Sequence, residues 1–501
     1  MLPNRPRNDI TSARAKGRPP DVARGDRAER MANAEVTCAP GGSIVGLVMP
    51  TDVPDEGAVA ASTALLTDHY ELTMLEAALR SGRASRRCVF EVFARSLPSG
   101  RRYGVVAGTG RLLEALRDFR FGDAEIADLA NRTIVDDATL SFLADYRFDG
   151  EVSGYAEGEC YFPGSPVLVV ESDFAHGVLL ETLVLSILNH DCAVASAASR
   201  MTGAAGTRPC IEMGSRRTHE WAGVAAARAA YVAGFATTSN LEAGRRWQVP
   251  TTGTSAHAFT LLHDDEKEAF AAQVDSLGVG TTLLVDTYDV RTAVRTAVEV
   301  AGPSLGAVRL DSGDLVELAA EVRAQLDGLG ATGTKIVVTS DLDEYAIAAL
   351  AAAPVDGYGV GTSLVTGSGA PTAGMVYKLV AREGDDGSMV SVAKVSKDKR
   401  SVGGRKWALR RRNGNGTAEA EVIGIGALPE DDGDDRPLLV DLVRDGEIVG
   451  ASPDAVPDGH RRVLDAARAR HEASVAELPR SAHQLSRGEP AIPTVYVDTT
   501  P

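Results

Sequence analysis

Residues 195 to about 370 constrain the fold most, because short apolar runs alternate there with polar loops and helical patterns. Four such segments follow one another, beginning at Thr281, Gly306, Thr334 and Asp356. Short strands that alternate with helices of about ten residues are typical of parallel βα units. Polar and glycine residues follow each strand, at the end where βα barrels carry their active sites. We therefore predict an α/β fold with a βα-barrel domain over residues 161–370.

The segments on either side predict structure of a different kind. Residues 61–160 mix short helices with strand-like runs such as "RCVFEVFAR", which indicates an α+β domain. Asp68 and Glu71 are spaced as a capping box for the first helix. Residues 371–501 continue with strand-like runs, an acidic loop, a helix and a polar tail, and we expect them to pack on the N-terminal domain. Residues 1–60 lack periodicity and a signal-like apolar run, which predicts a disordered extension.

Charge and cysteine content exclude several functional classes. A formal net charge of -17 argues against a broad binding surface for nucleic acid or anionic membrane, so local arginines and backbone amides must hold any anionic ligand. The most apolar long stretch starts at Gly177 but contains Glu181 and Asp191, which favours a buried helix over a membrane span. The five cysteines form no CxxC pair, which favours a reducing, cytoplasmic setting.

The segment "AVRLDSGDL" places a guanidinium and two carboxylates at one strand end. Arg309 is suited to grip an anion, and Asp311 is suited to accept hydrogen bonds from ribose hydroxyls. An Arg-Asp ion pair, with Asp314 as a helix cap, explains the same residues without any ligand. The segment alone does not decide between a sugar phosphate site and this structural reading.

Three other loops carry candidate ligand-binding residues. Asp341 would lie on the same rim as Asp311, whereas Asp343 is placed to cap the next helix. Arg216, in "IEMGSRR", is suited to bind phosphate, although a solvated charge run is the plainer reading. A glycine-rich turn after a late strand is suited to cradle a phosphate, and its candidates are Gly359, Gly361 and Thr362.

His257 lies in "TTGTSAHAF", in the first turn of a predicted helix that starts near Thr254. The positive end of the helix dipole disfavours a protonated imidazole, and a neutral imidazole is a nucleophile that can accept a phosphoryl group. A capping or packing role remains open for a single histidine at this position. The residues that surround His257 in space must decide between these two readings.

Six motifs occur together in the order typical of nicotinate phosphoribosyltransferases: "LTDHYELTM", "FARSLPSGRRYGVVAG", "IEMGSRR", "GTSAHAF", "VRLDSGDL" and "GYGVGTSLVT". The chain resembles that family over residues 65 to about 410. The resemblance implies the irregular βα barrel of type II phosphoribosyltransferases, joined to an α+β domain built from the N- and C-terminal segments. It also implies ATP-coupled transfer of a phosphoribosyl group from 5-phosphoribosyl 1-pyrophosphate to nicotinate, which gives nicotinate mononucleotide in NAD salvage.

The resemblance gives roles to the residues nearest the predicted chemistry. His257 would be phosphorylated by ATP, and Thr254 would contact nicotinate. Tyr70 would stack on the pyridine ring, often from the partner subunit of a homodimer with a shared active site, although an aromatic residue in a first helical turn also packs without any ligand. Magnesium would neutralise the leaving pyrophosphate. The sequence assigns no protein ligand to that metal.

The remaining roles concern the carboxylate, the ribose and the phosphates. Arg309 resembles the arginine near the nicotinate carboxylate, and Asp311 and Asp341 resemble the ribose contacts. Arg216 resembles the arginine on the phosphate side. The loop that holds the 5-phosphate in the family corresponds to Gly359, Gly361 and Thr362.

Other functions remain open. Nicotinamide phosphoribosyltransferase carries an acidic residue where "GFATTSN" supplies Thr237, Thr238 and Ser239, and neutral hydroxyls favour the acid over the amide as substrate. A barrel lyase or isomerase acting on another sugar phosphate would explain the rim carboxylates, and a non-catalytic nucleotide-binding protein could keep the barrel. Two segments receive no role: "KRSVGGRKWALRR", where Gly403 and Gly404 replace the family's Pro-Gly pair, and "LLVDTYD", which resembles a type I acidic motif only superficially.

Overall fold

The computed structural model describes residues 62–394, 402–450, 453 and 457–499. Every described residue belongs to one compact unit, which spans residues 60–501. The predicted extension, residues 1–60, therefore lies outside the described residues, as does part of the basic segment. Among the described helices, none combines the length and apolar character that crossing a bilayer requires.

A six-stranded parallel sheet forms the part of the fold that the repeated βα pattern predicts. Its order is β7-β6-β11-β10-β9-β8, and all of its pairings are parallel. Strands β7 and β8 are its two edges, so the described sheet is a half-barrel and not a closed barrel. The chain between β7 and β8 forms helices and supplies no further strand. The six strands are β6 (Cys210–Glu212), β7 (Thr237–Thr238), β8 (Thr282–Leu284), β9 (Ala307–Leu310), β10 (Lys335–Val338) and β11 (Gly357–Val360).

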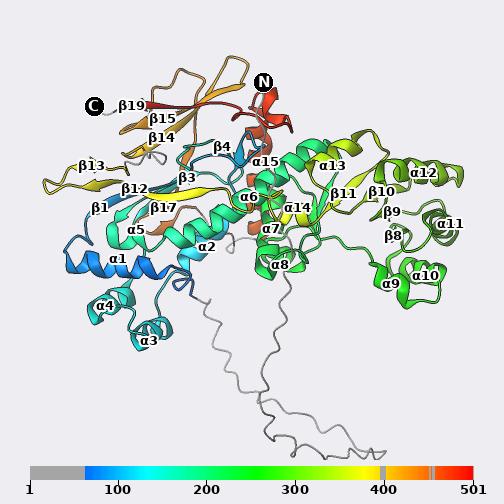
Figure 1. Cartoon of the computed structure of the whole chain (residues 1–501), viewed down its shortest axis with the longest axis horizontal. Coiled ribbons are helices and arrows are strands. Elements are labelled where there is room, and N and C mark those ends of the chain that lie inside the picture. The colour runs from blue at the N-terminus through cyan, green and yellow to red at the C-terminus, as the bar shows by residue number, and fades with distance from the viewer. Residues whose placement is uncertain (1–61, 395–401, 451–452, 454–456, 500–501) are drawn as a thin grey trace, which may run out of the picture. The chain divides into compact units, whose positions relative to one another are not determined.

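Helices connect these strands, and their caps follow from the sequence. Asp289, Asp314 and Asp343 each accept a backbone N–H bond at the start of the following helix, which confirms the caps predicted at Asp314 and Asp343. Figure 1 shows α10, α11 and α12 along the outer side of β8, β9 and β10. The helices are α7 (Glu220–Val232), α8 (Leu241–Trp247), α9 (His257–Leu262), α10 (Glu266–Leu277), α11 (Val290–Ala301), α12 (Leu315–Gly328), α13 (Glu344–Ala349) and α14 (Thr362–Val365), with a 3-10 turn at Leu350–Ala352.

A seven-stranded antiparallel sheet combines strands from both ends of the described chain. Its order is β13-β12-β1-β5-β3-β17-β18, so β12 pairs with β1, and β17 pairs with β3. Strand β5 also belongs to this sheet, and the parallel sheet starts only at β6. The strands are β1 (Arg87–Ala94), β3 (Glu151–Tyr155), β5 (Leu168–Asp173), β12 (Met375–Glu383), β13 (Met389–Ser391), β17 (Leu439–Arg444) and β18 (Glu447–Ile448).

Long helix α6 (Glu181–Ala205) belongs to both hydrophobic cores. Leu183 and Ile187 pack in the core beside the antiparallel sheet, whereas Ala197 and Met201 pack in the core of the half-barrel. The helix is therefore buried along most of its length, as its apolar sequence predicts. The other helices of this region are α1 (His69–Arg80), α2 (Thr109–Arg117), α3 (Asp123–Asn131), α4 (Asp137–Asp145) and α5 (Phe174–Val178).

The predicted first helix is present as α1, but its predicted capping box is wrong. Asp68 occupies the N-cap position without a capping side-chain bond. Glu71 is fully buried and accepts hydrogen bonds from the backbone N–H (2.9 Å) and the hydroxyl of Thr182 at the start of α6. A tertiary contact thus replaces the local one, because α1 packs against the chain that enters α6.

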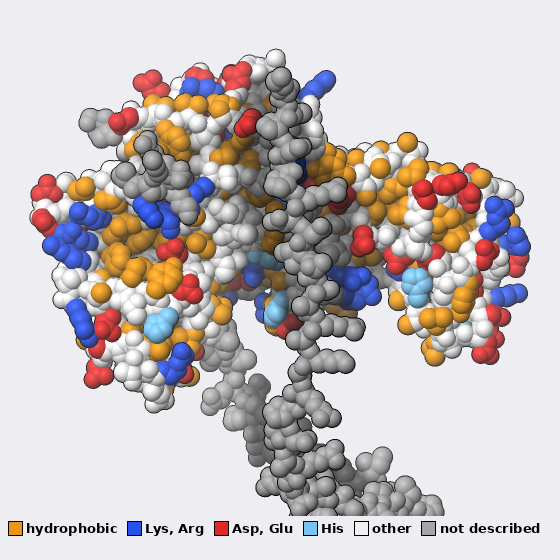
Figure 2. Space-filling model, viewed as in Figure 1, with side chains coloured by type: hydrophobic (Ala, Val, Ile, Leu, Met, Phe, Trp, Pro, Cys, Tyr) orange, Lys and Arg blue, Asp and Glu red, His pale blue; other side chains and the backbone are white. Residues whose placement is uncertain are grey.

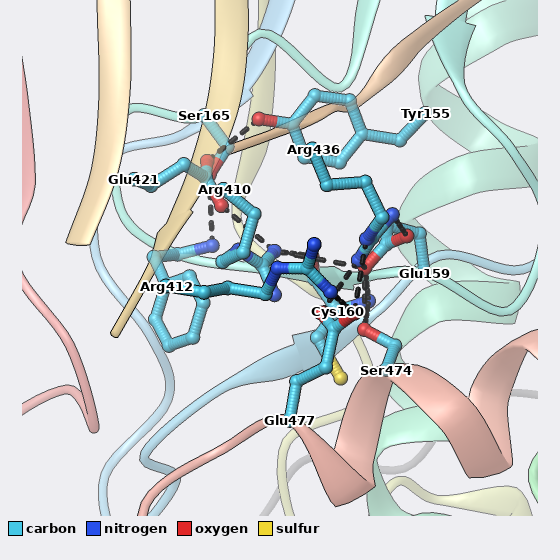
Figure 3. Close-up of polar contacts among 11 residues, drawn as sticks. Tyr155, Glu159, Cys160, Ser165, Arg410, Arg412, Glu421, Arg436, Ser474 and Glu477 are labelled. Atoms are coloured by element: carbon cyan, nitrogen blue, oxygen red, sulfur yellow. Dashed lines mark hydrogen bonds and ion pairs between the residues drawn. The ribbon is translucent and has the colours of Figure 1, made fainter. Parts of the chain in front are cut away.

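A buried network of charged side chains holds the C-terminal part to the N-terminal part (Figure 3). Arg410 is fully buried and forms an ion pair with Glu421 at 3.0 Å. Arg436 bridges Glu159 (2.7 Å) and Glu477 (2.8 Å). The network draws residues from β4 (Cys160–Tyr161), β14 (Lys406–Arg412), β15 (Ala418–Ile425), β16 (Arg436–Pro437) and α15 (Gly459–Ala476). The remaining elements of the fold are β2 (Gly104–Val105), β19 (Thr494–Asp498) and the 3-10 turn Arg480–His483.

Candidate active site

The candidate site lies at the C-terminal rim of the half-barrel, where the loops after β8, β9, β10 and β11 meet. Parallel strands bring these loops to one edge of the sheet, and the segment before α9 runs beside it through a parallel bridge between Thr238 and Thr251. On the face shown in Figure 2, acidic and basic side chains are interspersed, and no continuous basic surface is visible among the described residues.

His257 forms a pair with Asp286. Its Nε2 lies 3.3 Å from Asp286 Oδ1, and the histidine side chain is 41% exposed whereas the aspartate is 2% exposed. The second oxygen of Asp286 accepts hydrogen bonds from the Asp311 backbone N–H (2.9 Å) and the Ser312 hydroxyl (2.8 Å). A carboxylate with these partners fixes one nitrogen of the imidazole and leaves the other nitrogen open to solvent.

Arg309 lies next to Thr254 at the same rim. Its guanidinium donates to Thr254 Oγ1 at 2.8 Å, and its Nε is buried without a partner among the described residues. Burial lowers the pKa of the Arg309 guanidinium from its usual value, Asp311 and Asp286 oppose that shift, and nearby Arg216 adds to it. An added anion at this position would satisfy a buried, incompletely paired cation.

Asp311 and Asp341 follow neighbouring strands but differ in how they are held. Asp311 accepts a hydrogen bond from the Thr339 hydroxyl, so its orientation is fixed by the end of β10. Asp341 is exposed. The residue before it, Ser340, has φ 120°, a strained backbone conformation for a residue with a side chain. Such outliers concentrate at functional sites, where surrounding contacts hold them.

The predicted glycine-rich turn is divided between β11 and the start of α14. Gly359 is buried within the strand, and a Cβ there would lie 2.4 Å from Thr339 and 2.8 Å from Met213. Its glycine is therefore explained by close packing beneath the rim. Gly361 is the N-cap residue of the short helix α14, and Thr362 is its first residue. Thr362 also borders a cavity of about 190 Å³ that Arg101 and other residues line.

Arg216 and Tyr70 differ in their distance from these residues. Arg216 is exposed on the loop after β6, near enough to Arg309 to influence its pKa. Tyr70 lies on α1, which Figure 1 places at the opposite end from α9, so one chain does not bring Tyr70 to the rim. Tyr70 is 44% exposed, and partial burial together with nearby carboxylates raises its pKa to about 12. A cavity of about 670 Å³ is also remote from the rim, since Arg405, Trp407 and strands of the seven-stranded sheet line it.

Comparison with known proteins places the chain in a family. Residues 65–189 match the nicotinate phosphoribosyltransferase (NAPRTase) N-terminal domain. The chain is 59% identical over 439 residues to nicotinate phosphoribosyltransferase pncB1 of Mycobacterium tuberculosis, an alignment that covers 86% of this chain and 94% of the relative. The chain belongs to the nicotinate phosphoribosyltransferase family. The family membership predicted from the six motifs is therefore confirmed.

Two more distant members of the nicotinate phosphoribosyltransferase family agree with this assignment. The Bacillus subtilis nicotinate phosphoribosyltransferase is 37% identical, over 73% of this chain and 76% of that relative. The crystal structure of human nicotinic acid phosphoribosyltransferase matches with a TM-score of 0.71 and 26% identity, and the match covers 86% of this chain and 97% of the human chain. A solved member of the family thus shares the combination of a parallel half-barrel with antiparallel sheets.

Sequence reasoning missed three rim residues, namely Asp286, Thr339 and Glu212. Asp286 lies in "LLVDTYD", which received no role because its likeness to a type I motif is superficial. Its position shortly after a strand was the signal, since Asp311 was selected for a similar position. Thr339 and Glu212 offered no sequence signal, because their importance depends on contacts with other loops.

Proposed function

We propose that this chain transfers a phosphoribosyl group from 5-phosphoribosyl 1-pyrophosphate to nicotinate, coupled to ATP through a phosphohistidine at His257. The observation that carries the proposal is the convergence of His257, Asp286, Arg309 and Asp311 at one rim. A relative 59% identical to this chain is named a nicotinate phosphoribosyltransferase, which supports the choice of substrate. The product would be nicotinate mononucleotide, an NAD precursor.

The phosphohistidine step follows from the pairing of His257 with Asp286. With its Nε2–H donating to the Asp286 carboxylate, the imidazole keeps a lone pair on Nδ1. That nitrogen attacks the γ-phosphorus of ATP, the bond to the bridging β,γ-oxygen breaks, and ADP leaves with that oxygen. The proton stays between Nε2 and Asp286, so the carboxylate stabilises the cationic imidazole as the new bond forms.

The transfer step needs positioning more than it needs a protein nucleophile. The pyridine nitrogen attacks C1 of the ribose as the bond to pyrophosphate breaks, and positive charge builds on the sugar. We assign the nicotinate carboxylate to Arg309 and Thr254, and the ribose hydroxyls to Asp311 and Asp341. We assign the phosphates to Arg216 and to the segment that contains Gly359, Gly361 and Thr362. Within that segment Gly359 contributes through its packing, since it is buried.

The rim fits magnesium as an ion shared with the substrate. The only group of three acidic side chains near enough together to bind a metal, within the part of the chain that the structure describes, is Asp431, Asp432 and Asp435, in a loop remote from the rim. Magnesium commonly uses one or two carboxylates and completes its shell with phosphate oxygens and water. Asp341 is the exposed rim carboxylate able to join such a shell. Bound magnesium would neutralise charge on the departing pyrophosphate.

The placement of Tyr70 bears on assembly. We propose a homodimer in which Tyr70 of the partner subunit stacks on the nicotinate ring, because α1 and α9 of one chain lie far apart (Figure 1). We also retain the division into an α+β domain (61–160 with 371–501) and a barrel domain (161–370) as a proposal. We also propose a cytoplasmic setting, which the cysteine content favours.

One incubation tests the activity and its alternatives. The protein is mixed with magnesium and 5-phosphoribosyl 1-pyrophosphate, with nicotinate or nicotinamide, and with or without ATP. We expect nicotinate mononucleotide as the product, with a higher rate or a higher final yield when ATP is present. Product from nicotinamide alone would establish the amide as the substrate. Turnover of another sugar phosphate without nicotinate transfer would establish a different barrel enzyme, and absence of any turnover would leave only a binding protein.

A further inference from the structure

Glu212 is a buried carboxylate at the rim that the proposed chemistry does not use. It is the last residue of β6 and is fully buried. One carboxylate oxygen accepts a hydrogen bond from the Gly214 backbone N–H, and the other accepts from the Thr238 hydroxyl. No basic side chain forms an ion pair with it among the described residues. Burial raises its pKa, so holding a carboxylate here is costly.

The contacts of Glu212 connect two rim loops into a closed ring. Thr238 Oγ1 also accepts from the Asn240 backbone N–H at 2.9 Å, and Asn240 Nδ2 donates to Ser215 Oγ at 2.9 Å. Ser215 follows Gly214, which returns the path to the carboxylate. The ring therefore joins the loop after β6 to the loop after β7.

Packing and a local turn also restrict the backbone of the loop after β6. The ring of hydrogen bonds therefore acts on a segment that has little room to move. A Cβ on Gly214 would lie 2.2 Å from Val365 in α14, so that backbone is pressed against the helix after β11. The Arg217 N–H then bonds the Gly214 carbonyl at 2.8 Å, which closes a turn around Arg216. Figure 1 shows α7, α8 and α14, the helices that follow these loops, next to one another.

We infer that Glu212 is a positioning residue that sets Arg216 for the phosphates of 5-phosphoribosyl 1-pyrophosphate, acting through Gly214 and Thr238. The inference rests on the proposed function and adds to it, since Glu212 touches no substrate itself. It also gives Thr238 a role different from contact with nicotinate, because its hydroxyl hydrogen is already donated to Glu212.

Four variants separate positioning from stability. Glu212→Ala and Thr238→Val remove the ring bonds. Glu212→Gln keeps an acceptor for Gly214 and offers a donor to Thr238, so it should restore most function. The matched control is Thr334→Val, which also removes one buried hydroxyl bond (Thr334 Oγ1 to the Leu305 carbonyl, 2.9 Å) but at the opposite end of the same sheet.

The measurements are KM for each substrate, kcat, thermal midpoint, and affinity for inorganic pyrophosphate by calorimetry, each also in an Arg216→Ala background. We expect Glu212→Ala and Thr238→Val to raise KM for 5-phosphoribosyl 1-pyrophosphate roughly tenfold, with KM for nicotinate changed less than about twofold. Neither change should weaken binding further once Arg216 is absent, because residues that act through one another are not additive. Thr334→Val should lower the thermal midpoint alone.

An effect of Glu212→Ala that adds fully to Arg216→Ala would overturn the inference, and so would an unchanged KM beside a lowered thermal midpoint. If Glu212→Ala does not fold, Thr238→Val and Glu212→Gln decide the question. A wild-type chain that makes no nicotinate mononucleotide would refute the proposed function. The pyrophosphate affinities of the variants would still test Glu212 in that case.

Discussion

Replacing Asp286 with asparagine tests the histidine mechanism at a residue that the motifs did not select. The change preserves shape but alters which group faces His257. The backbone N–H of Asp311 (2.9 Å) and the hydroxyl of Ser312 (2.8 Å) hold one oxygen, so the amide oxygen of the introduced asparagine would take that place. Its NH2 group then faces His257 Nε2, across the 3.3 Å contact that the second carboxylate oxygen makes now.

An amide donor at that position forces His257 into the other tautomer. Nε2 would become the acceptor and Nδ1 would carry the hydrogen, so the nitrogen that attacks ATP would lose its lone pair. In a serine protease, the equivalent change behind a catalytic histidine lowers the rate by about 10⁴-fold. We expect a loss of roughly that size in phosphorylation of His257. The lost charge-assisted hydrogen bonds should cost about 1–3 kcal/mol of folding stability.

One assay measures the acid-labile label that is transferred from γ-labelled ATP to the protein. A second assay measures the nicotinate mononucleotide that is formed without ATP. Asp289→Asn is the matched control, because Asp289 caps α11 three residues further on and asparagine caps helices equally well. That variant should behave as wild type. Phosphorylation of Asp286→Asn at the wild-type rate, in protein whose thermal transition is intact, would refute the assignment of Asp286.

Three further predictions concern catalysis, pH and the buried network. His257→Ala should abolish both acid-labile phosphorylation and stimulation by ATP, and retention of either would remove His257 from the mechanism. Burial lowers the pKa of His471 to about 4, so between about pH 6.5 and pH 4 the unfolded chain binds a proton that the folded chain does not. Stability should therefore fall by up to about 3 kcal/mol as pH drops through that window, and His471→Gln should flatten this part of a urea-denaturation pH profile. Glu421→Ala leaves Arg410 fully buried beside an empty position, and it should lower the free energy of unfolding by about 3–5 kcal/mol in the same assay. A loss below about 1 kcal/mol would show that water or Glu159 compensates for the missing carboxylate.

Local patterns predicted the elements of the fold better than they predicted its closure. The βα repeats indicated the strands and helices of the parallel sheet, because hydrophobic periodicity and aspartate caps act within a few residues. They did not reveal that β7 and β8 remain edges, since closure depends on segments distant in sequence. The same reason applies to Glu71, whose spacing predicted a cap but whose partner is Thr182, and to Glu212, whose partner is Thr238.

The order of acidic residues within the βα repeats is a better guide to the rim residues than the separate motifs are. Three consecutive units carry two acids after the strand: Asp286 and Asp289, Asp311 and Asp314, Asp341 and Asp343. In each unit the second acid caps the following helix, a role that the helix start dictates.

The first acid of each pair has no helix N–H to satisfy and lies at the rim, where Asp286 holds His257 and Asp311 is held by Thr339. Treating the units as equivalent would have selected Asp286 from the sequence, because its unit has the same order of strand, rim acid and cap acid as the other two. The same comparison separates rim acids from helix-cap acids without any knowledge of the fold's closure, since it uses only their distance from the strand end and from the helix start.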